Sequence, residues 1–145
     1  MKLLVADDNT TLREELAALL RDDEHEVITA SDGGEALRIV ERESFDAALL
    51  DLRMPKATGL EVLHRLRVVR PDTAVVMITG EGTIDAAVEA MKGGAIDFVE
   101  KPYEIEALRR TLQWWNWRSA SDPAVSARRA PGIASVMPRD DRQHF

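Results

Sequence analysis

Three aspartates, a threonine and a lysine are the residues of this sequence whose types and spacing best suit phosphate chemistry. Asp7 and Asp8 directly follow one apolar run, Asp51 ends another, and Thr79 and Lys101 lie at the ends of two more. Three carboxylates in one pocket would repel one another, so a cation is needed to keep them ionised together. Ligands that are all oxygens favour a hard cation, and Mg²⁺ is the usual one where phosphate reacts.

Asp51 is the candidate nucleophile of this set, because a carboxylate can attack phosphorus and form an acyl phosphate. The Lys101 ammonium and the Thr79 hydroxyl can each interact with phosphoryl oxygens. Gly80, next to the threonine, leaves room for a ligand to approach the backbone. Each residue also has an ordinary alternative. The Asp7-Asp8 pair could be a strand-end turn, Asp51 a helix cap, Thr79 a simple turn residue and Lys101 a solvated side chain.

The elements that must position these residues are short apolar strands alternating with amphipathic helices. Strands are predicted over residues 2–6, 27–30, 45–50, 74–78 and 95–99. Apolar residues at helical spacing follow each strand, starting at Leu12, Ala36, Leu60, Ile84 and Ile105. The fourth helix has the clearest stripe, which ends at Met91, and this stripe predicts that Met91 is a core residue.

Strict alternation of strands and helices predicts an α/β fold with a parallel sheet covered by helices on both faces. A strand order of 2-1-3-4-5 would place the first, third, fourth and fifth strands side by side. In open sheets of this kind, ligands bind beyond the carboxyl ends of the strands. All five candidate residues lie at such ends, so we expect them to share one pocket.

These signals, taken in order, resemble the receiver domain of bacterial two-component response regulators. The resemblance rests on Asp7-Asp8, on Asp51 within Leu49-Leu50-Asp51-Leu52-Arg53-Met54-Pro55, on Gly59, on Thr79-Gly80 and on Lys101-Pro102. It implies a flavodoxin-like, doubly wound fold of five strands and five helices over residues 1–118. The stretch from 77 to 103 most resembles receivers of σ54-type activators or of the FixJ-like class.

The resemblance also implies a role for each matching residue. Asp51 would accept a phosphoryl group, and Asp8 and Asp51 would bind Mg²⁺ directly together with the backbone carbonyl of Arg53. Asp7 would act on the metal through water, and Lys101 would pair with a phosphoryl oxygen.

The residues that respond to phosphorylation are implied in the same way. Thr79 would turn toward the phosphoryl group, and Phe98 matches the aromatic switch residue that moves inward behind it. The bond before Pro102 matches one that is cis in the family. Arg53 and Glu81 occupy the positions that influence hydrolysis of the aspartyl phosphate.

The expected partner is a sensor histidine kinase or a histidine phosphotransfer protein, and the expected role is a phosphorylation switch linked to transcription rather than an enzyme. The output surface would lie on the fourth helix, fifth strand and fifth helix, which could also form a homodimer. Its expected residues are Ala86, Glu89, Ala90, Phe98 and Tyr103.

The composition excludes several other classes. The chain has 145 residues, no cysteine and a formal net charge of −7, which argues against disulfides, thiolate metal sites and direct nucleic-acid binding. No apolar stretch approaches the ~20 residues that span a bilayer, so a cytoplasmic protein without a membrane contact is expected. Residues 119–145 contain three prolines and no apolar period, and are predicted to be a flexible polar tail. The tail shows neither an ATPase nor a helix-turn-helix pattern, which leaves a stand-alone receiver or one separated from a longer protein.

Three rival functions remain open from the residues. A haloacid-dehalogenase-type phosphatase also uses an aspartate and Mg²⁺, but it needs an acid two residues after the nucleophile, where Arg53 stands. A flavodoxin-like binding module would need a phosphate-cradling loop where Asp7 and Asp8 would repel the ligand. The third rival is a protein-interaction module of the same fold that works without phosphate.

Overall fold

The computed structural model describes residues 1–122, and the chain divides into two units, 1–103 and 104–145. The first unit contains five strands: β1 (Lys2–Ala6), β2 (Glu26–Ala30), β3 (Ala47–Asp51), β4 (Ala74–Thr79) and β5 (Asp97–Glu100). Its helices are α1 (Thr10–Asp22), α2 (Gly33–Arg42), α3 (Gly59–Val69) and α4 (Ile84–Lys92).

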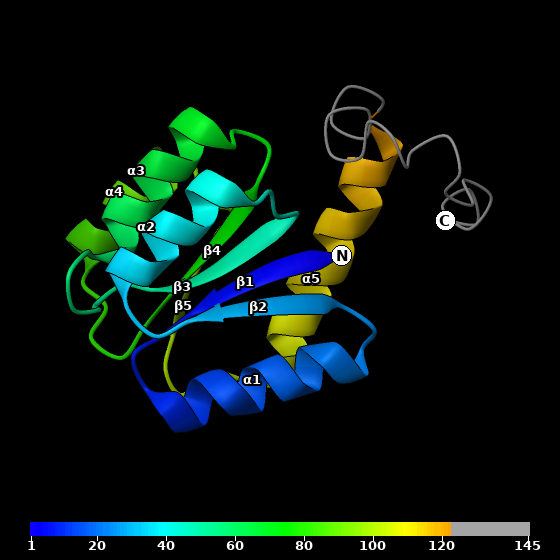
Figure 1. The fold of residues 1–145 in the computed structure, drawn as a ribbon, viewed down its shortest axis with the longest axis horizontal. Coiled ribbons are helices and arrows are strands. Elements are labelled where there is room, and N and C mark those ends of the chain that lie inside the picture. Colours follow the sequence, from blue (N-terminus) through cyan, green and yellow to red (C-terminus); the bar gives the residue numbers. More distant parts are fainter. Residues whose placement is uncertain (123–145) are drawn as a thin grey trace. The chain divides into compact units, whose positions relative to one another are not determined.

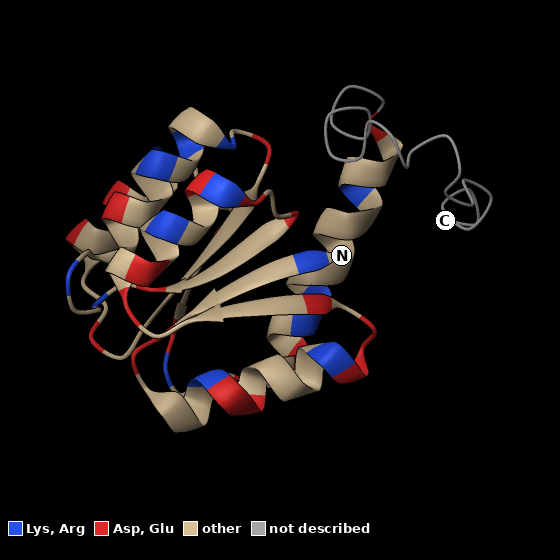
Figure 2. Ribbon diagram, in the orientation of Figure 1, with Lys and Arg blue, Asp and Glu red and all other residues tan. Residues whose placement is uncertain are grey.

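All strands are parallel, and their order is β2-β1-β3-β4-β5, so the predicted topology is confirmed. Figure 1 shows α1 on one side of this sheet and α2, α3 and α4 on the other. The strands consist of apolar residues through their centres, whereas charged residues lie on the helices and loops (Figure 2). Every residue of β3 and β4 is buried, which fixes the carboxyl ends of both strands rigidly.

The fourth helix corrects one expectation. Met91, predicted to be in the core, is 47% exposed, and Ile84 and Val88 are exposed with it, whereas Ala90 is fully buried. The small face of α4 therefore packs inward, because alanine lets the helix lie close to its neighbours, and the larger apolar stripe faces solvent. Ala90 is consequently not part of the accessible output surface that was expected.

The second unit contains α5 (Ile105–Ser121), with Leu108 and Leu112 buried and Trp114 and Trp117 largely exposed. The Arg118 guanidinium lies over the Trp114 ring, 5.5 Å from its centre. Residues 119–121, at the start of the predicted tail, are helical. The rest of that predicted tail, 123–145, lies outside the described residues.

Arg70 offers a test of how the helices on one face are held. Its Nε donates to the carbonyl oxygens of Val40 and Glu43 at 3.2 and 3.3 Å, and its Nη2 donates to that of Glu41 at 3.3 Å. These bonds place a cation on the carboxyl end of α2. We expect Arg70→Ala to lower the free energy of unfolding by about 2 kcal/mol, measured by urea denaturation.

The matched control for that prediction is Arg38→Ala, which removes an exposed arginine from the middle of α2. It should change the free energy of unfolding by less than about 0.5 kcal/mol. Equal effects of the two substitutions would show that Arg70 has no special role in capping the helix.

Candidate functional site

Asp7, Asp8 and Asp51 come together at the carboxyl edge of the sheet. Asp7 and Asp8 directly follow β1, Asp51 is the last residue of β3, and these two strands are paired neighbours. One carboxylate oxygen from each residue lies within 4.8 Å of the others. Asp7 and Asp51 are buried, whereas Asp8 is exposed, so the cluster opens to solvent on the Asp8 side.

Asp7 is held at both of its carboxylate oxygens. The backbone N–H of Asn9 donates to Oδ1 at 2.9 Å, and Lys101 Nζ donates to Oδ2 at 2.8 Å. The Asp7 carbonyl oxygen accepts a bond from Arg13 Nη1 at 3.0 Å. Sequence reasoning missed Asn9 and Arg13. The position of Asn9 just before a helix, where asparagine is a preferred cap, was a usable signal for the first of them.

Lys101 joins the two buried carboxylates. It follows β5, and its Nζ lies 3.5 Å from Asp51 Oδ2 as well as 2.8 Å from Asp7 Oδ2. Burial lowers the pKa of Lys101, but the bonds and charges of the two aspartates outweigh burial, so its pKa is raised and its positive charge is secured. The Lys101-Pro102 bond is cis, as the resemblance implies.

The Asp51 carboxyl has the most perturbed acidity of the cluster. Burial and the charge of Asp7 raise its pKa from 3.8 to about 7, against the opposing effects of Lys101 and of the Arg53 backbone N–H. That N–H lies 3.4 Å from Asp51 Oδ1, so the main chain at residue 53 lies beside this carboxyl. The cluster is therefore short of positive charge, and a bound cation would let Asp51 ionise fully at neutral pH.

The raised pKa of Asp51 predicts how stability depends on pH in the metal-free protein. Because the folded pKa of about 7 lies above the ordinary value of 3.8, the folded state holds this proton more tightly than the unfolded state. The resulting stability is present below about pH 4 and is lost as the pH rises through about 7. Asp51→Asn, which cannot ionise, should therefore be more stable than the natural chain at pH 8, by up to about 4 kcal/mol, and nearly equal to it at pH 4.

Urea denaturation in EDTA at the two pH values measures this difference. A difference in the free energy of unfolding that is the same at pH 4 and pH 8 would contradict the raised pKa of Asp51.

Thr79 and Phe98 lie on the neighbouring strands. Thr79 ends β4 and is 1% exposed, and its hydroxyl oxygen accepts a bond from the Glu81 backbone N–H at 3.1 Å. Phe98 in β5 is partly buried and packs against the core. A Cβ atom added to Gly82 would lie 3.0 Å from the Phe98 ring and 3.1 Å from Thr79 Cγ2, so this loop lies against both side chains.

An ion pair connects the two loops that follow β3 and β4. Arg53 Nε lies 3.5 Å from Glu81 Oε2, and both side chains are well exposed. Both residues therefore lie in the loops that directly follow Asp51 and Thr79.

The donor set fits a hard divalent cation. Its candidate side-chain ligands are the carboxylates of Asp7, Asp8 and Asp51. Within residues 1–122, no cysteine or histidine belongs to this group. Asp8 supplies an accessible oxygen and Asp51 a buried one, and the Arg53 backbone nitrogen lies 3.4 Å from Asp51 Oδ1. Mg²⁺ suits such an oxygen site.

Comparison with known proteins gives one consistent result. A family model described as "Response regulator receiver domain" matches residues 3–113. The alginate biosynthesis transcriptional regulatory protein AlgB of Pseudomonas aeruginosa is 36% identical over 108 residues, which is 74% of this chain and 24% of that protein. The chain thus spans about a quarter of the length of this curated relative, and such relatives are regulators of transcription, as the resemblance implied.

Solved structures agree with the sequence matches. The beryllofluoride-activated NtrC4 receiver domain dimer is 32% identical with a TM-score of 0.74, covering 79% of this chain and 94% of that one. The response regulator TrrA of Thermotoga maritima, in complex with Mg²⁺ and BeF, is 27% identical with a TM-score of 0.71, covering 79% and 97%. None of the helices within residues 1–122 combines the length and apolar character that a membrane span requires.

Proposed function

Because this chain belongs to the response regulator receiver domain family, we propose that it is a signalling switch in which Asp51 accepts a phosphoryl group. Domains of this family are regulatory and are not classical enzymes. The observation that supports the proposal best is the buried Asp51 carboxylate, which lies with Asp7 and Asp8 in one cluster and 3.5 Å from the Lys101 ammonium. No other described group of acids forms such a cluster.

The proposed reaction transfers a phosphoryl group from a phosphohistidine of a sensor histidine kinase or a histidine phosphotransfer protein. An Asp51 carboxylate oxygen attacks phosphorus, a P–O bond forms, the P–N bond breaks, and the imidazole nitrogen keeps the electron pair. Lys101 is placed to move from Asp51 to a phosphoryl oxygen, because its second partner, Asp7, keeps it in the pocket. Positioning and charge account for most of the rate in this chemistry.

We assign Mg²⁺ to the side chains of Asp7, Asp8 and Asp51 and to the carbonyl of Arg53. The TrrA structure, described as a complex with Mg²⁺ and BeF, supports this assignment by similarity. When bound, the cation supplies positive charge to the phosphoryl oxygens. The protein's part is to hold the three carboxylates close together before the cation arrives.

The phosphoryl group would then act through Thr79 and Phe98. The Thr79 hydroxyl, at the end of β4, accepts from the Glu81 N–H and still has its own proton to donate to a phosphoryl oxygen once the side chain turns toward it. Phe98 would respond to this movement of Thr79, since Gly82 lies against both side chains. In the same region, the Arg53–Glu81 pair would have to open for water to reach and hydrolyse the aspartyl phosphate.

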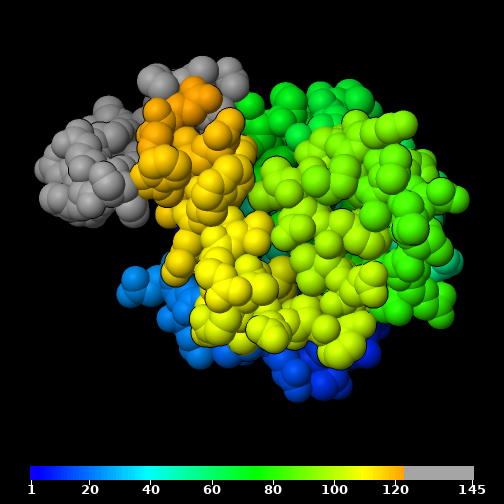
Figure 3. Space-filling model, turned by 180° about the vertical axis from the view of Figure 1, so that it is seen from behind, coloured from blue at the N-terminus to red at the C-terminus, as the bar shows by residue number. Residues whose placement is uncertain are grey.

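The output surface is assigned to α4 and β5, with α5 remaining a prediction from the sequence. Ile84, Val88 and Met91 form an exposed apolar stripe on α4, which a partner or a second copy would cover. Figure 3 shows the yellow-green segment that contains α4 and β5 on the face turned to the viewer. The NtrC4 receiver, described as a dimer when activated, supports a homodimer by similarity.

The remaining assignments follow from the family and the sequence. We propose a receiver domain over residues 1–118, a cytoplasmic location, and control of a transcription-linked effector, because the curated relative is a transcriptional regulatory protein. The chain itself would not contact nucleic acid.

Incubation with acetyl phosphate tests the phosphoryl-acceptor proposal. We expect intact-protein mass spectrometry to show one added phosphoryl group with MgCl₂ and at least about tenfold less with EDTA. Steady turnover of a phosphomonoester without a stable adduct would instead support a phosphatase. No adduct under either condition would contradict the proposal and favour a phosphate-independent interaction module.

A further inference from the structure

Arg13 is a charged side chain that lies beside the acidic cluster without belonging to it. It is in the first turns of α1, and its side chain is only 12% exposed. Its Nη1 donates to the Asp7 carbonyl oxygen at 3.0 Å, whereas among residues 1–122 its Nη2 approaches only the exposed Glu14, at 3.5 Å. The bond to Asp7 is therefore the contact that defines where this guanidinium lies.

With this bond, Asp7 is fixed on every side. Its backbone N–H donates to the Ala30 carbonyl at 3.1 Å, and its two carboxylate oxygens accept from Asn9 and Lys101. The Asp7 carbonyl belongs to the peptide plane that leads to Asp8. Rotation of that plane would swing the Asp8 side chain away from Asp51.

Asp8 depends on that peptide plane more than its neighbours do. It is exposed, and within residues 1–122 its carboxylate makes no hydrogen bond or ion pair. Its backbone is thus what keeps its oxygen within 4.8 Å of those of Asp7 and Asp51. A rotation of the Asp7–Asp8 peptide should therefore displace the Asp8 carboxylate more than the other two carboxylates.

We infer that Arg13 is a positioning residue for cation binding, which acts by fixing the Asp7–Asp8 peptide so that the Asp8 carboxylate faces the cluster. This inference rests on the proposed Mg²⁺ site. Charge alone predicts the opposite result, because a guanidinium close to a cation site repels the cation. The sign of the effect of removing Arg13 therefore separates positioning from simple electrostatics.

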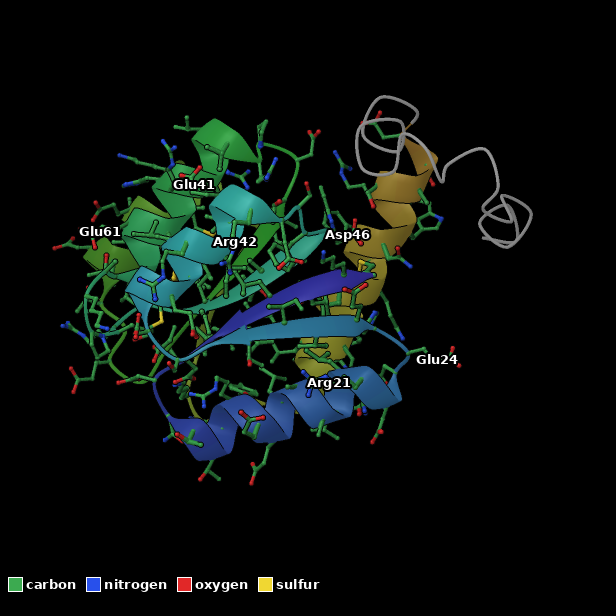
Figure 4. All side chains as sticks on the ribbon, viewed as in Figure 1. Arg21, Glu24, Glu41, Arg42, Asp46 and Glu61 are labelled. Carbon is green, nitrogen blue, oxygen red and sulfur yellow. The ribbon has the colours of Figure 1, made fainter. Side chains whose placement is uncertain are left out.

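The test compares Arg13→Met with Arg21→Met. Arg21 lies at the other end of α1, as labelled in Figure 4, and its Nη2 likewise donates to a backbone carbonyl, that of Val27, at 2.9 Å. Mg²⁺ affinity is measured from the backbone amide NMR signals of Asp8 and Asn9 during a MgCl₂ titration. We expect Arg13→Met to weaken the affinity about tenfold and Arg21→Met to change it less than about twofold.

The outcomes distinguish this inference from the proposed function. No Mg²⁺ binding by the natural chain would overturn both, whereas normal binding by the natural chain with equal or tighter binding by Arg13→Met would overturn only the role of Arg13. Urea denaturation of each variant shows whether it is folded. If Arg13→Met is unfolded, Arg13→Lys, which keeps the charge but loses the planar fork, should bind about threefold more weakly, and unchanged affinity would reject the inference.

Discussion

Replacing Asp51 with asparagine is expected to abolish labelling by acetyl phosphate in Mg²⁺, with a loss of more than about a hundredfold. The asparagine amide has nearly the same shape as the carboxylate but is a very poor nucleophile toward phosphorus. It also removes one of the three acids of the cluster. Labelling is measured by intact-protein mass spectrometry over a time course.

Asp85→Asn is the matched control for that substitution. Asp85 is an exposed residue in the first turn of α4 and lies outside the acidic cluster. It should leave labelling within about twofold of the natural chain. Undiminished labelling of Asp51→Asn would show that the acceptor is another residue.

The substitution Gly59→Ala is expected to cause a large loss of stability. A Cβ atom at this position would lie 2.4 Å from the Asp51 carbonyl oxygen, 2.8 Å from Met77 Sδ and 3.0 Å from Leu52 Cα. Two of these atoms are backbone and cannot rotate away, so β3 or α3 must shift. We expect the free energy of unfolding to fall by about 3 kcal/mol in urea denaturation, although alanine itself favours a helix.

The control is Gly80→Ala, at a position where an added Cβ meets nothing within 4 Å. It should change the free energy of unfolding by less than about 0.5 kcal/mol. A similar loss in both variants would mean that alanine is tolerated no better where space is free, and would contradict the packing of Gly59 against the acceptor residue.

Much of this fold could be predicted from the residues because its signals are local. Buried strands such as β4 are continuous apolar runs, and glycines and capping residues mark the ends of helices. The topology then follows from strict alternation. The gathering of Asp7, Asp51 and Lys101 was also predictable, since all three lie at the carboxyl ends of strands (β1, β3 and β5) of one parallel sheet.

What could not be predicted depends on packing between elements. Periodicity identifies the apolar stripe of α4. It does not determine which face of the helix packs inward, and in the structure Ala90 is buried while Met91 faces solvent. The contact of Arg13 with the Asp7 carbonyl likewise depends on how α1 lies beside β1. On an amphipathic helix, no sequence signal distinguishes an arginine that bonds to a neighbouring loop from an arginine that is merely solvated.

Trapping the phosphorylated residue tests the central claim most directly. The protein is labelled with acetyl phosphate and MgCl₂, reduced with borohydride to convert an acyl phosphate to an alcohol, and digested for tandem mass spectrometry. We predict that the alcohol product occurs at position 51 and is absent when EDTA replaces MgCl₂. Its appearance at Asp7, Asp8 or another carboxylate, with Asp51 unmodified, would contradict the assignment of Asp51 as the phosphoryl acceptor.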